Sequence, residues 1–286
     1  MIDERIAFGD ADVGELKLHY AIAGKGERLV ILLHGFPEFW YSWRHQLVAL
    51  ADDYTVVAPD MRSYNLSDRP GNVSDYTIDH LADDVARLIR HFGRDQAAVV
   101  GHDWGAAVAW NFAFTRPELV WKLAALQVPP AFIWKRNQTL RQYLASWYMF
   151  FFQLPFLPEL VFTMNDFAVI TRSLRRSTSV PDVFTDADFA IYKDAWSQTG
   201  APSAMINYYR ANVSRARLRA QDRKIDVPTL FIYGEKDQAV LPKTVAGIRS
   251  VVTGEYVEHR IPGSGHWVQQ EAADEVTEVL RRFLAD

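Results

Sequence analysis

A buried strand that runs directly into a helix is the feature that most constrains the fold of this sequence. Residues 97–100 read Ala-Ala-Val-Val, residues 101–105 read Gly-His-Asp-Trp-Gly, and an alanine-rich helical pattern continues over residues 104–115. The two glycines permit a tight turn between strand and helix. An entirely apolar strand that leads straight into a helix is typical of a parallel sheet covered by helices on both faces. This feature favours the α/β class.

The rest of the chain alternates in the same way. Residues 77–92 repeat apolar positions at helical spacing and stop at Gly93, which predicts a crossover helix, and residues 271–284 predict a C-terminal helix. Apolar runs bounded by turn residues predict further strands at residues 15–23, 28–33, 54–59, 123–128, 229–233 and 255–261. A mostly parallel central sheet is therefore expected.

One long segment breaks this alternation. Residues 130–222 contain many aromatic side chains at helical spacing and no convincing buried strand, which predicts a helical cap inserted into the sheet. We therefore expect a first part of the core at residues 1–129, the cap at 130–222 and the second part of the core at 223–286.

Composition excludes several classes of function. Hydrophobic residues make up 49% of the 286 residues and charged residues 23%, as in soluble globular proteins. The net charge of −4, without any Lys/Arg-rich block, argues against a nucleic-acid partner or an anionic membrane. The absence of cysteine excludes disulfides, thiolate catalysis and Cys-based metal sites. The first residues lack the basic start and apolar core of a signal peptide, so a cytoplasmic location is expected.

The central residue of the 101–105 turn is the candidate nucleophile. A strand, a tight glycine turn and a helix form a nucleophile elbow, which raises one side chain above the sheet. In this sequence that side chain is the carboxylate of Asp103. The short pattern alone is weak evidence, because aspartate also commonly caps helices.

Other segments supply the groups that such a nucleophile requires. Residues 34–37, His-Gly-Phe-Pro, end an earlier strand, so the backbone N–H groups of Phe36 and Trp104 are expected to form an oxyanion hole. His266, on a glycine-rich loop near the C-terminus, is the candidate base. Asp237 follows a predicted strand and is the candidate orienting acid, with Glu235 on the same loop as its rival. The chain order of nucleophile, acid and base is that of the α/β-hydrolases.

Four segments together resemble the soluble epoxide hydrolase family. They are His-Gly-Phe-Pro-Glu-Phe-Trp at residues 34–40, Asp-Met-Arg-Ser-Tyr-Asn-Leu-Ser-Asp at 60–68, Gly-His-Asp-Trp-Gly at 101–105 and Gly-His-Trp at 265–267. The resemblance runs over nearly the whole chain and implies an α/β-hydrolase fold with a helical cap. One position departs from the family pattern, since Ser63 stands where the family usually has glycine.

The resemblance also implies a pair of tyrosines in the cap. Residues 147–153 and 207–210 look similar to the family segments that carry them, and the roles transfer to Tyr148 and Tyr209. The choice between Tyr208 and Tyr209 stays open at this point, because adjacent residues on a helix point in different directions. Without the resemblance, all three tyrosines read as ordinary core residues.

These residues predict the hydrolysis of an epoxide to a vicinal diol. Asp103 attacks a ring carbon while Tyr148 and Tyr209 bind the epoxide oxygen, and water activated by His266 then cleaves the resulting ester. The expected partners are a small epoxide and water; no metal or organic cofactor is expected, and the chain is expected to be a monomer or a homodimer. Aromatic cap residues predict an apolar pocket for hydrophobic or aromatic epoxides, or else the core of the cap itself: Trp147, Phe150, Phe151, Phe152 and Phe156.

Two alternatives share this scaffold. A haloalkane or fluoroacetate dehalogenase has a similar Asp–His–acid set, although fluoroacetate dehalogenases typically carry arginine after the nucleophile, where this chain has Trp104. A non-catalytic ligand-binding protein is the other alternative, because a fold alone does not establish an activity.

Overall fold

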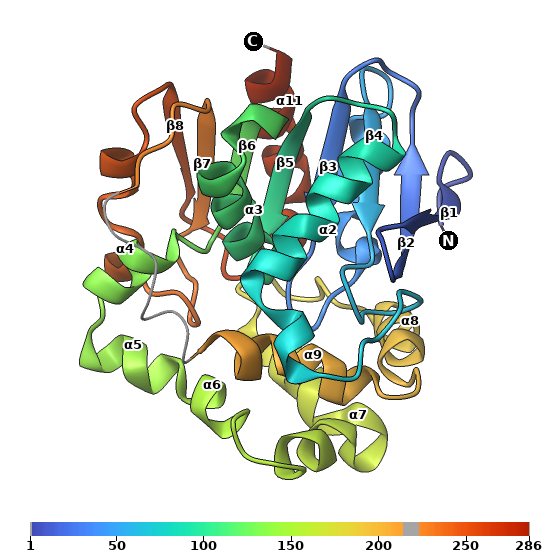
Figure 1. The fold of residues 1–286 in the computed structure, drawn as a ribbon. Coiled ribbons are helices and arrows are strands. Elements are labelled where there is room, and N and C mark those ends of the chain that lie inside the picture. The colour runs from blue at the N-terminus through green and yellow to red at the C-terminus, as the bar shows by residue number, and fades with distance from the viewer. Residues whose placement is uncertain (1, 214–222, 286) are drawn as a thin grey trace.

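The structure, a computed structural model, describes residues 2–213 and 223–285. Eight strands form a single sheet in the order β1-β2-β4-β3-β5-β6-β7-β8 (Figure 1). The strands are β1 (Ala7–Asp12), β2 (Lys17–Ala23), β3 (Leu29–Leu33), β4 (Thr55–Pro59), β5 (Ala97–His102), β6 (Val120–Leu126), β7 (Thr229–Gly234) and β8 (Tyr256–Ile261).

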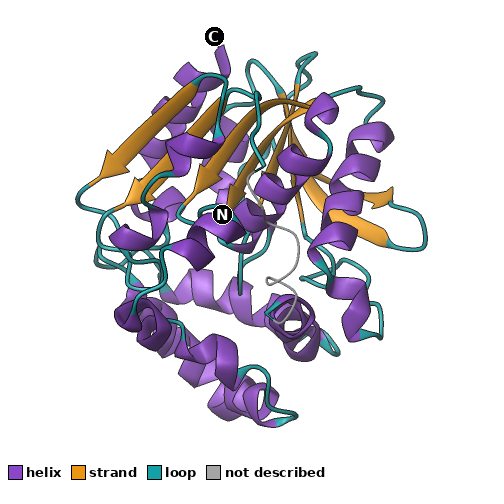
Figure 2. Cartoon of the chain, turned by 60° about the vertical axis from the view of Figure 1, so that its left-hand side comes forward, coloured by secondary structure: helices purple, strands orange, loops and turns teal. Residues whose placement is uncertain are grey.

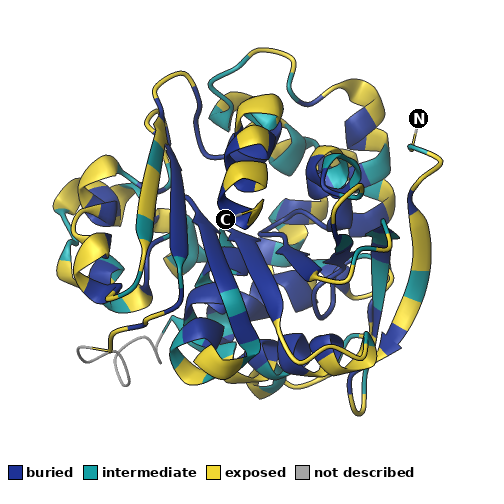
Figure 3. Cartoon of the chain, turned by 90° about the horizontal axis from the view of Figure 1, so that it is seen from above, coloured by how far each residue is buried: buried dark blue, intermediate teal, exposed yellow. Residues whose placement is uncertain are grey.

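The sheet is parallel from β4 to β8, and β1 and β2 run antiparallel at one edge. All residues of β3, β5 and β7 are buried, because helices cover both faces of these central strands (Figure 3). Burial on both faces explains why these strands are almost continuously apolar in sequence. The predicted α/β fold with a mostly parallel sheet is confirmed.

Strand β1 was not predicted from the sequence. Its residues are mostly exposed and only Ala11 is buried, so they show no alternation of apolar and polar positions. The strand forms through antiparallel pairing with β2 at the edge of the sheet, which is a tertiary contact.

The helices divide into those that flank the sheet and those that lie beyond one end of it (Figure 2). The flanking helices are α1 (Arg44–Ala49), α2 (Ile78–His91), α3 (Trp104–Thr115), α10 (Val268–Glu271) and α11 (Ala273–Ala285). The others, inserted between β6 and β7, are α4 (Ala131–Arg136), α5 (Leu140–Ala145), α6 (Trp147–Phe151), α7 (Leu157–Ser177), α8 (Asp186–Trp196) and α9 (Ala201–Asn212). Short 3-10 turns include η1 (Trp40–Trp43), η2 (Val73–Tyr76), η3 (Pro117–Leu119), η5 (Pro242–Val245) and η6 (Ile248–Val251).

The inserted helices α4–α9 fall within residues 130–222, where the cap was expected, and we refer to them as the cap. The cap is hydrogen-bonded to the core at separate points. Trp196 of α8 donates its indole N–H to the Pro37 carbonyl at 2.7 Å, and Asn212 at the end of α9 accepts from the Ile78 N–H at 2.9 Å. The division of the chain into 1–129, 130–222 and 223–286 as separate units stays a prediction. No helix of the described residues is long and apolar enough to span a bilayer.

Candidate active site

The turn from β5 to α3 holds Asp103 in a strained conformation. Its backbone angles are φ 51° and ψ −117°, which a non-glycine residue adopts at a cost of about 1–3 kcal/mol. The flanking glycines allow strand and helix to approach this closely. A β-carbon on Gly101 would lie 2.2 Å from the Gly105 carbonyl oxygen, and one on Gly105 would lie 2.1 Å from the Leu33 carbonyl oxygen. The predicted elbow geometry is thus present.

The Asp103 carboxylate lies between a backbone donor and an imidazole. Its Oδ1 accepts the Phe36 N–H at 2.9 Å, and its Oδ2 lies 3.6 Å from His266 Nε2. Burial raises the pKa of Asp103, but the bonds to His266 and Phe36 outweigh burial and hold that pKa below its usual value. Asp103 is therefore ionised and available as a nucleophile.

His266 is buried and bridges the two aspartates. Its Nδ1 lies 2.8 Å from Asp237 Oδ2, which leaves Nε2 facing Asp103. Burial lowers the pKa of His266, but the Asp237 and Asp103 carboxylates more than offset this and raise that pKa well above its usual value. Asp237 is itself fixed by the N–H groups of Ala239 and Val240, which donate to its Oδ1 at 2.7 and 2.9 Å.

The rival acid lies elsewhere. Glu235 is exposed, and its carboxylate is 3.9 Å from the Arg260 guanidinium on β8. Asp237 is only 3% exposed and contacts the imidazole directly. Of the two carboxylates on this loop, the structure brings only Asp237 to the site.

The two predicted tyrosines converge above the elbow. The rings of Tyr148 and Tyr209 lie 5.9 Å apart, edge to face, and the Tyr209 ring also lies 5.1 Å from Trp104 and 5.3 Å from Phe36. Burial, followed for Tyr148 by the Asp103 charge, raises the pKa of both phenols. Both phenols therefore keep their protons and can donate them in hydrogen bonds.

Tyr208 turns away from this group. Its hydroxyl donates to the Arg62 carbonyl at 2.7 Å, and its ring packs 5.2 Å from Tyr64 in the core. Of these two residues, Tyr209 packs against Tyr148 and Tyr208 is bound to the core, and the role of Tyr209 stays a prediction. Trp104, the remaining predicted site residue, is the first residue of α3, where backbone N–H groups have no partner within the helix.

Comparison with known proteins identifies the family. Residues 28–273 match the alpha/beta hydrolase fold family. The AB hydrolase superfamily protein YfhM of Bacillus subtilis is 39% identical, over 94% of each chain. Epoxide hydrolase 3 of Mus musculus is 40% identical, over 95% of this chain and 74% of the mouse protein. This chain belongs to the epoxide hydrolase family of the α/β-hydrolase fold.

Solved structures agree with this assignment. A mutant epoxide hydrolase from Bacillus megaterium, complexed with its product, a naphthyloxy-propane-1,2-diol, superposes with a TM-score of 0.86 at 30% identity. The superposition covers 97% of this chain and all of the other. The family inferred from the sequence motifs is confirmed.

Glu38 and His102 were not among the predicted site residues, although both lie within the motifs typical of epoxide hydrolases. The two side chains are fully buried, with His102 Nδ1 2.9 Å from Glu38 Oε2. His102 Nε2 faces the His266 carbonyl at 2.8 Å and must donate to it, because a carbonyl only accepts. His102, the residue before the nucleophile, thus holds the loop that carries His266. The available signal was a glutamate in an otherwise apolar segment, which suggests a buried partner.

Glu271 is a second residue that sequence analysis missed. Its carboxylate accepts the N–H groups of Gly265 at 2.7 Å and Trp267 at 3.2 Å, on either side of His266. His102 and Glu271 therefore fix the backbone of the His266 loop from two sides. Nothing in the local sequence distinguishes Glu271 from an ordinary surface glutamate.

Ser63, which replaces the usual glycine of epoxide hydrolases, adopts the backbone conformation that glycine favours. Its φ is 75°, and its hydroxyl donates to the Tyr76 hydroxyl at 2.8 Å. The Tyr76 hydroxyl in turn donates to the Pro70 carbonyl at 2.7 Å. A hydrogen bond of this kind contributes about 1 kcal/mol, which is comparable to the cost of the left-handed backbone.

The cap aromatics do not all line one pocket. Phe152 is buried and its ring lies 5.4 Å from Phe36 beside the site. Trp147, Phe150 and Phe156, by contrast, are 62%, 55% and 86% exposed. The prediction that these residues belong to an apolar pocket or to the core of the cap is therefore wrong for these three.

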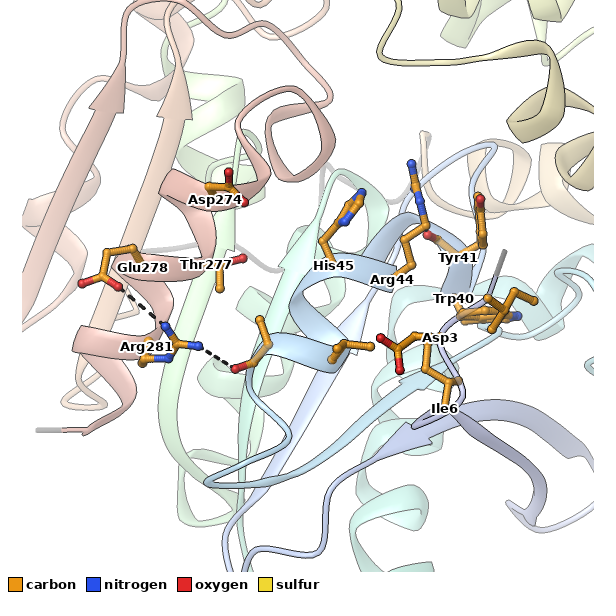
Figure 4. A pocket seen from close by; sticks show the side chains of 13 residues that line it. Asp3, Ile6, Trp40, Tyr41, Arg44, His45, Asp274, Thr277, Glu278 and Arg281 are labelled. Atoms are coloured by element: carbon orange, nitrogen blue, oxygen red, sulfur yellow. Dashed lines mark hydrogen bonds and ion pairs between the residues drawn. The ribbon is translucent and has the colours of Figure 1, made fainter.

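A cavity of about 660 Å³ lies away from the catalytic residues, between the N-terminal segment, α1 and α11 (Figure 4). Its lining includes Trp40, Arg44 and Arg281, and Arg281 is bound to the Ala49 carbonyl and paired with Glu278. None of the predicted catalytic residues lines it. Within the described residues, no group of three or more His, Asp or Glu side chains could hold a metal ion.

Proposed function

We propose that the protein hydrolyses epoxides to vicinal diols through an ester on Asp103. One observation carries this proposal. The carboxylate on the elbow contacts a His–Asp pair, and two phenols that pack against each other lie beside it, with the Tyr209 ring against Phe36 and Trp104. A carboxylate can displace oxygen from a saturated carbon, and phenols can supply the proton that the departing oxygen needs.

In the first half of the reaction, Tyr148 and Tyr209 hold the epoxide oxygen by hydrogen bonds. Asp103 attacks a ring carbon, the bond between that carbon and the epoxide oxygen breaks, and the oxygen takes a proton from a phenol. The product is a hydroxyalkyl ester of Asp103. The raised pKa of both phenols keeps them protonated until the alkoxide forms.

In the second half, His266 takes a proton from water, and the hydroxide attacks the carbonyl carbon of the ester. The N–H groups of Phe36 and Trp104 stabilise the resulting oxyanion. Phe36 already donates to Asp103 Oδ1 at 2.9 Å. Collapse of the intermediate breaks the bond between this carbon and the alkoxy oxygen, which takes the proton held by His266 and leaves as the second hydroxyl of the diol. The remaining proton of the attacking water returns to the phenolate, which restores the ionised Asp103 and both phenols.

The charge of Asp103 affects the pKa of His266, the proposed base. In the free enzyme, Asp103 and Asp237 both favour the protonated form of His266. Formation of the ester removes the charge of Asp103 and leaves only Asp237, so the pKa of His266 falls. The imidazole therefore becomes a better proton acceptor at the stage when a base is required.

This switch predicts the effect of Asp103→Asn, which imitates the uncharged ester. The pKa of His266 is expected to be lower in the variant than in the unmodified enzyme, as measured by NMR titration of the imidazole nitrogens. His259→Gln, on the surface beside Glu275, is the matched control and should leave the His266 titration unchanged. An equal or higher pKa in Asp103→Asn would contradict the switch.

The substrate is proposed to be a hydrophobic or aromatic epoxide. Phe36, Phe152 and Trp104 surround Tyr209 with ring distances of 4.9–5.3 Å, so the groups nearest to the phenol pair are aromatic. The related Bacillus megaterium enzyme is complexed with a naphthyloxy diol, which supports the same class of substrate here. A cytoplasmic location stays a prediction from the sequence.

The fate of the oxygen of water tests the proposed route. In a single turnover in oxygen-18 water with enzyme in excess, the diol should be mostly unlabelled and the peptide containing Asp103 should become heavier. The reason is that the oxygen added to the diol comes from the carboxylate, whereas water attacks the carboxyl carbon. Heavy oxygen in the diol together with an unchanged peptide would show that water attacks the epoxide directly. Asp103 would then act as a general base and not as the nucleophile.

A further inference from the structure

Helix α5 buries a polar side chain and exposes apolar ones, which is the reverse of an ordinary surface helix. Its polar residue Gln142 is fully buried, with its amide N–H bound to the Ala239 carbonyl at 2.6 Å and its oxygen accepting the Leu241 N–H at 2.9 Å. Ser146, which follows the helix, is also buried and lies 2.9 Å from the Gln142 amide. A surface helix normally buries its apolar face and exposes its polar one. The outer side of α5 therefore lacks an apolar partner.

Exposed apolar side chains continue from α5 into α6, and Leu144 is a further one on α5. Six exposed residues are spaced alternately three and four positions apart, and we call them the cap seam: Leu140, Tyr143, Trp147, Phe150, Leu154 and Leu157. The first four lie on α5 and α6, and the last two lie in the following turn and at the start of α7. Leu140 and Tyr143 share one side of α5, and Trp147 and Phe150 share one side of α6, because residues three apart lie on the same side of a helix. Figure 1 shows α5 and α6 at the outer edge of the cap, away from the sheet.

The exposed apolar surface is large for a monomer. The side chains of the cap seam are 45–77% exposed, and the neighbouring Phe156 is 86% exposed. With about 150–250 Å² for a large side chain, these seven residues expose on the order of 800 Å². The largest patch on a typical monomer is about 300–600 Å², and each partner of a stable dimer contributes about 800 Å².

We propose that the cap seam is the interface of a homodimer, in which α5 and α6 of one protomer pack against the same helices of a second copy. A two-fold interface brings each patch against itself, so like charges on the patch would repel. The cap seam is uncharged, and Arg141 is the one charged residue in 140–151. Self-association of the cap seam therefore brings none of its own side chains into like-charge repulsion.

A bilayer fits this surface less well. Helices that lie in a membrane interface place Lys and Arg on a polar face that meets the lipid headgroups. The polar face of α5 is instead bound to the core through Gln142, which also accepts the Thr244 hydroxyl at 2.8 Å. Helix α5 itself carries a single basic residue, Arg141, rather than a basic face.

The proposed interface lies next to the catalytic residues. Helix α6 carries Tyr148 toward Tyr209 while Trp147 and Phe150 face outward. On α5, Gln142 holds the carbonyl of Ala239, and the N–H of Ala239 is bound to Asp237. The dimer proposal does not depend on the reaction and is tested without substrate.

Sedimentation velocity of the full chain at micromolar concentration is expected to give twice the mass of one chain. Trp147→Glu places two like charges in an apolar interface and should give a monomer. Leu66→Glu is the matched control, because Leu66 is similarly exposed (58%) but lies in the loop after β4, and it should stay dimeric. Circular dichroism of both variants checks that the fold is retained. A monomeric unmodified chain, or a dimer that Trp147→Glu does not weaken, would overturn the proposal.

The cysteine-free chain allows a second, direct measurement. A single spin label at Tyr143→Cys should report a short, well-defined distance between protomers, and a label at Leu66→Cys a longer one. Interprotomer distances that are shorter at Leu66 than at Tyr143 would place the interface elsewhere. Co-sedimentation of a monomeric chain with phosphatidylglycerol vesicles would identify the patch as a membrane site and reject the dimer.

Discussion

His266→Gln is expected to lower the steady-state turnover of an epoxide by roughly 10³- to 10⁴-fold while the first ring opening still proceeds. The Phe36 N–H still binds Oδ1 of Asp103 in this variant, so the nucleophile stays in place for the first attack. Glutamine cannot take a proton from water, so only the second half of the reaction is lost. The ester should accumulate in an amount equal to that of the enzyme, and intact-protein mass spectrometry should show the added mass of one substrate.

The site of this added mass decides the assignment. Digestion should locate it on the peptide that contains Asp103. His259→Gln makes the same replacement at a surface histidine paired with Glu275 and should turn over normally. Rapid alkylation of any other peptide, or steady diol formation by His266→Gln without an ester, would refute the role of His266 as the base.

Replacing both cap tyrosines with phenylalanine is expected to lower the rate of ring opening by roughly 10²- to 10³-fold. Each replacement removes only a hydroxyl, so the ring contacts of Tyr148 and Tyr209 with each other and with Trp104 persist. Without a donor, the alkoxide leaves unprotonated and the barrier rises. Single-turnover measurement of ester formation checks this step separately from hydrolysis.

Tyr208→Phe is the matched control for this pair, because it alters the adjacent residue on the same helix. Its hydroxyl is bound to the Arg62 carbonyl, so its removal should cost about 1 kcal/mol of stability and leave ring opening intact. If Tyr208→Phe abolished ring opening while Tyr209→Phe did not, the two tyrosines would exchange roles. Undiminished ring opening by the folded double variant would reject phenol donors altogether.

The local sequence was sufficient to predict the central sheet and the nucleophile elbow. Strands β3, β5 and β7 are buried on both faces, so each appears in the sequence as a continuous apolar run. Gly101 and Gly105 mark the turn, because neither position has room for a side chain. The apolar runs and the glycine spacing are patterns of consecutive residues, so they could be read without knowledge of the tertiary packing that they accompany. The same is true of the chain order of Asp103, Asp237 and His266, which could be read directly.

Only the tertiary structure could decide between neighbouring candidates. Tyr208 and Tyr209 are adjacent on one helix, but the Tyr208 hydroxyl is bound to the Arg62 carbonyl, whereas the Tyr209 ring packs against Tyr148. Glu235 and Asp237 are likewise two positions apart, and the turn after β7 directs one to solvent and the other to His266. Such orientations depend on partners that lie far away in the sequence.

The sequence by itself determined the fold class, the nucleophile elbow and the family. The tertiary structure alone decided the pairing of Glu38 with His102, the edge position of β1 and the exposure of the cap aromatics. The physical reason is that burial of a charge or of an aromatic ring depends on what packs against it. Trp147 and Phe152 have similar hydrophobic character, yet one faces outward at 62% exposure and the other lies buried beside Phe36.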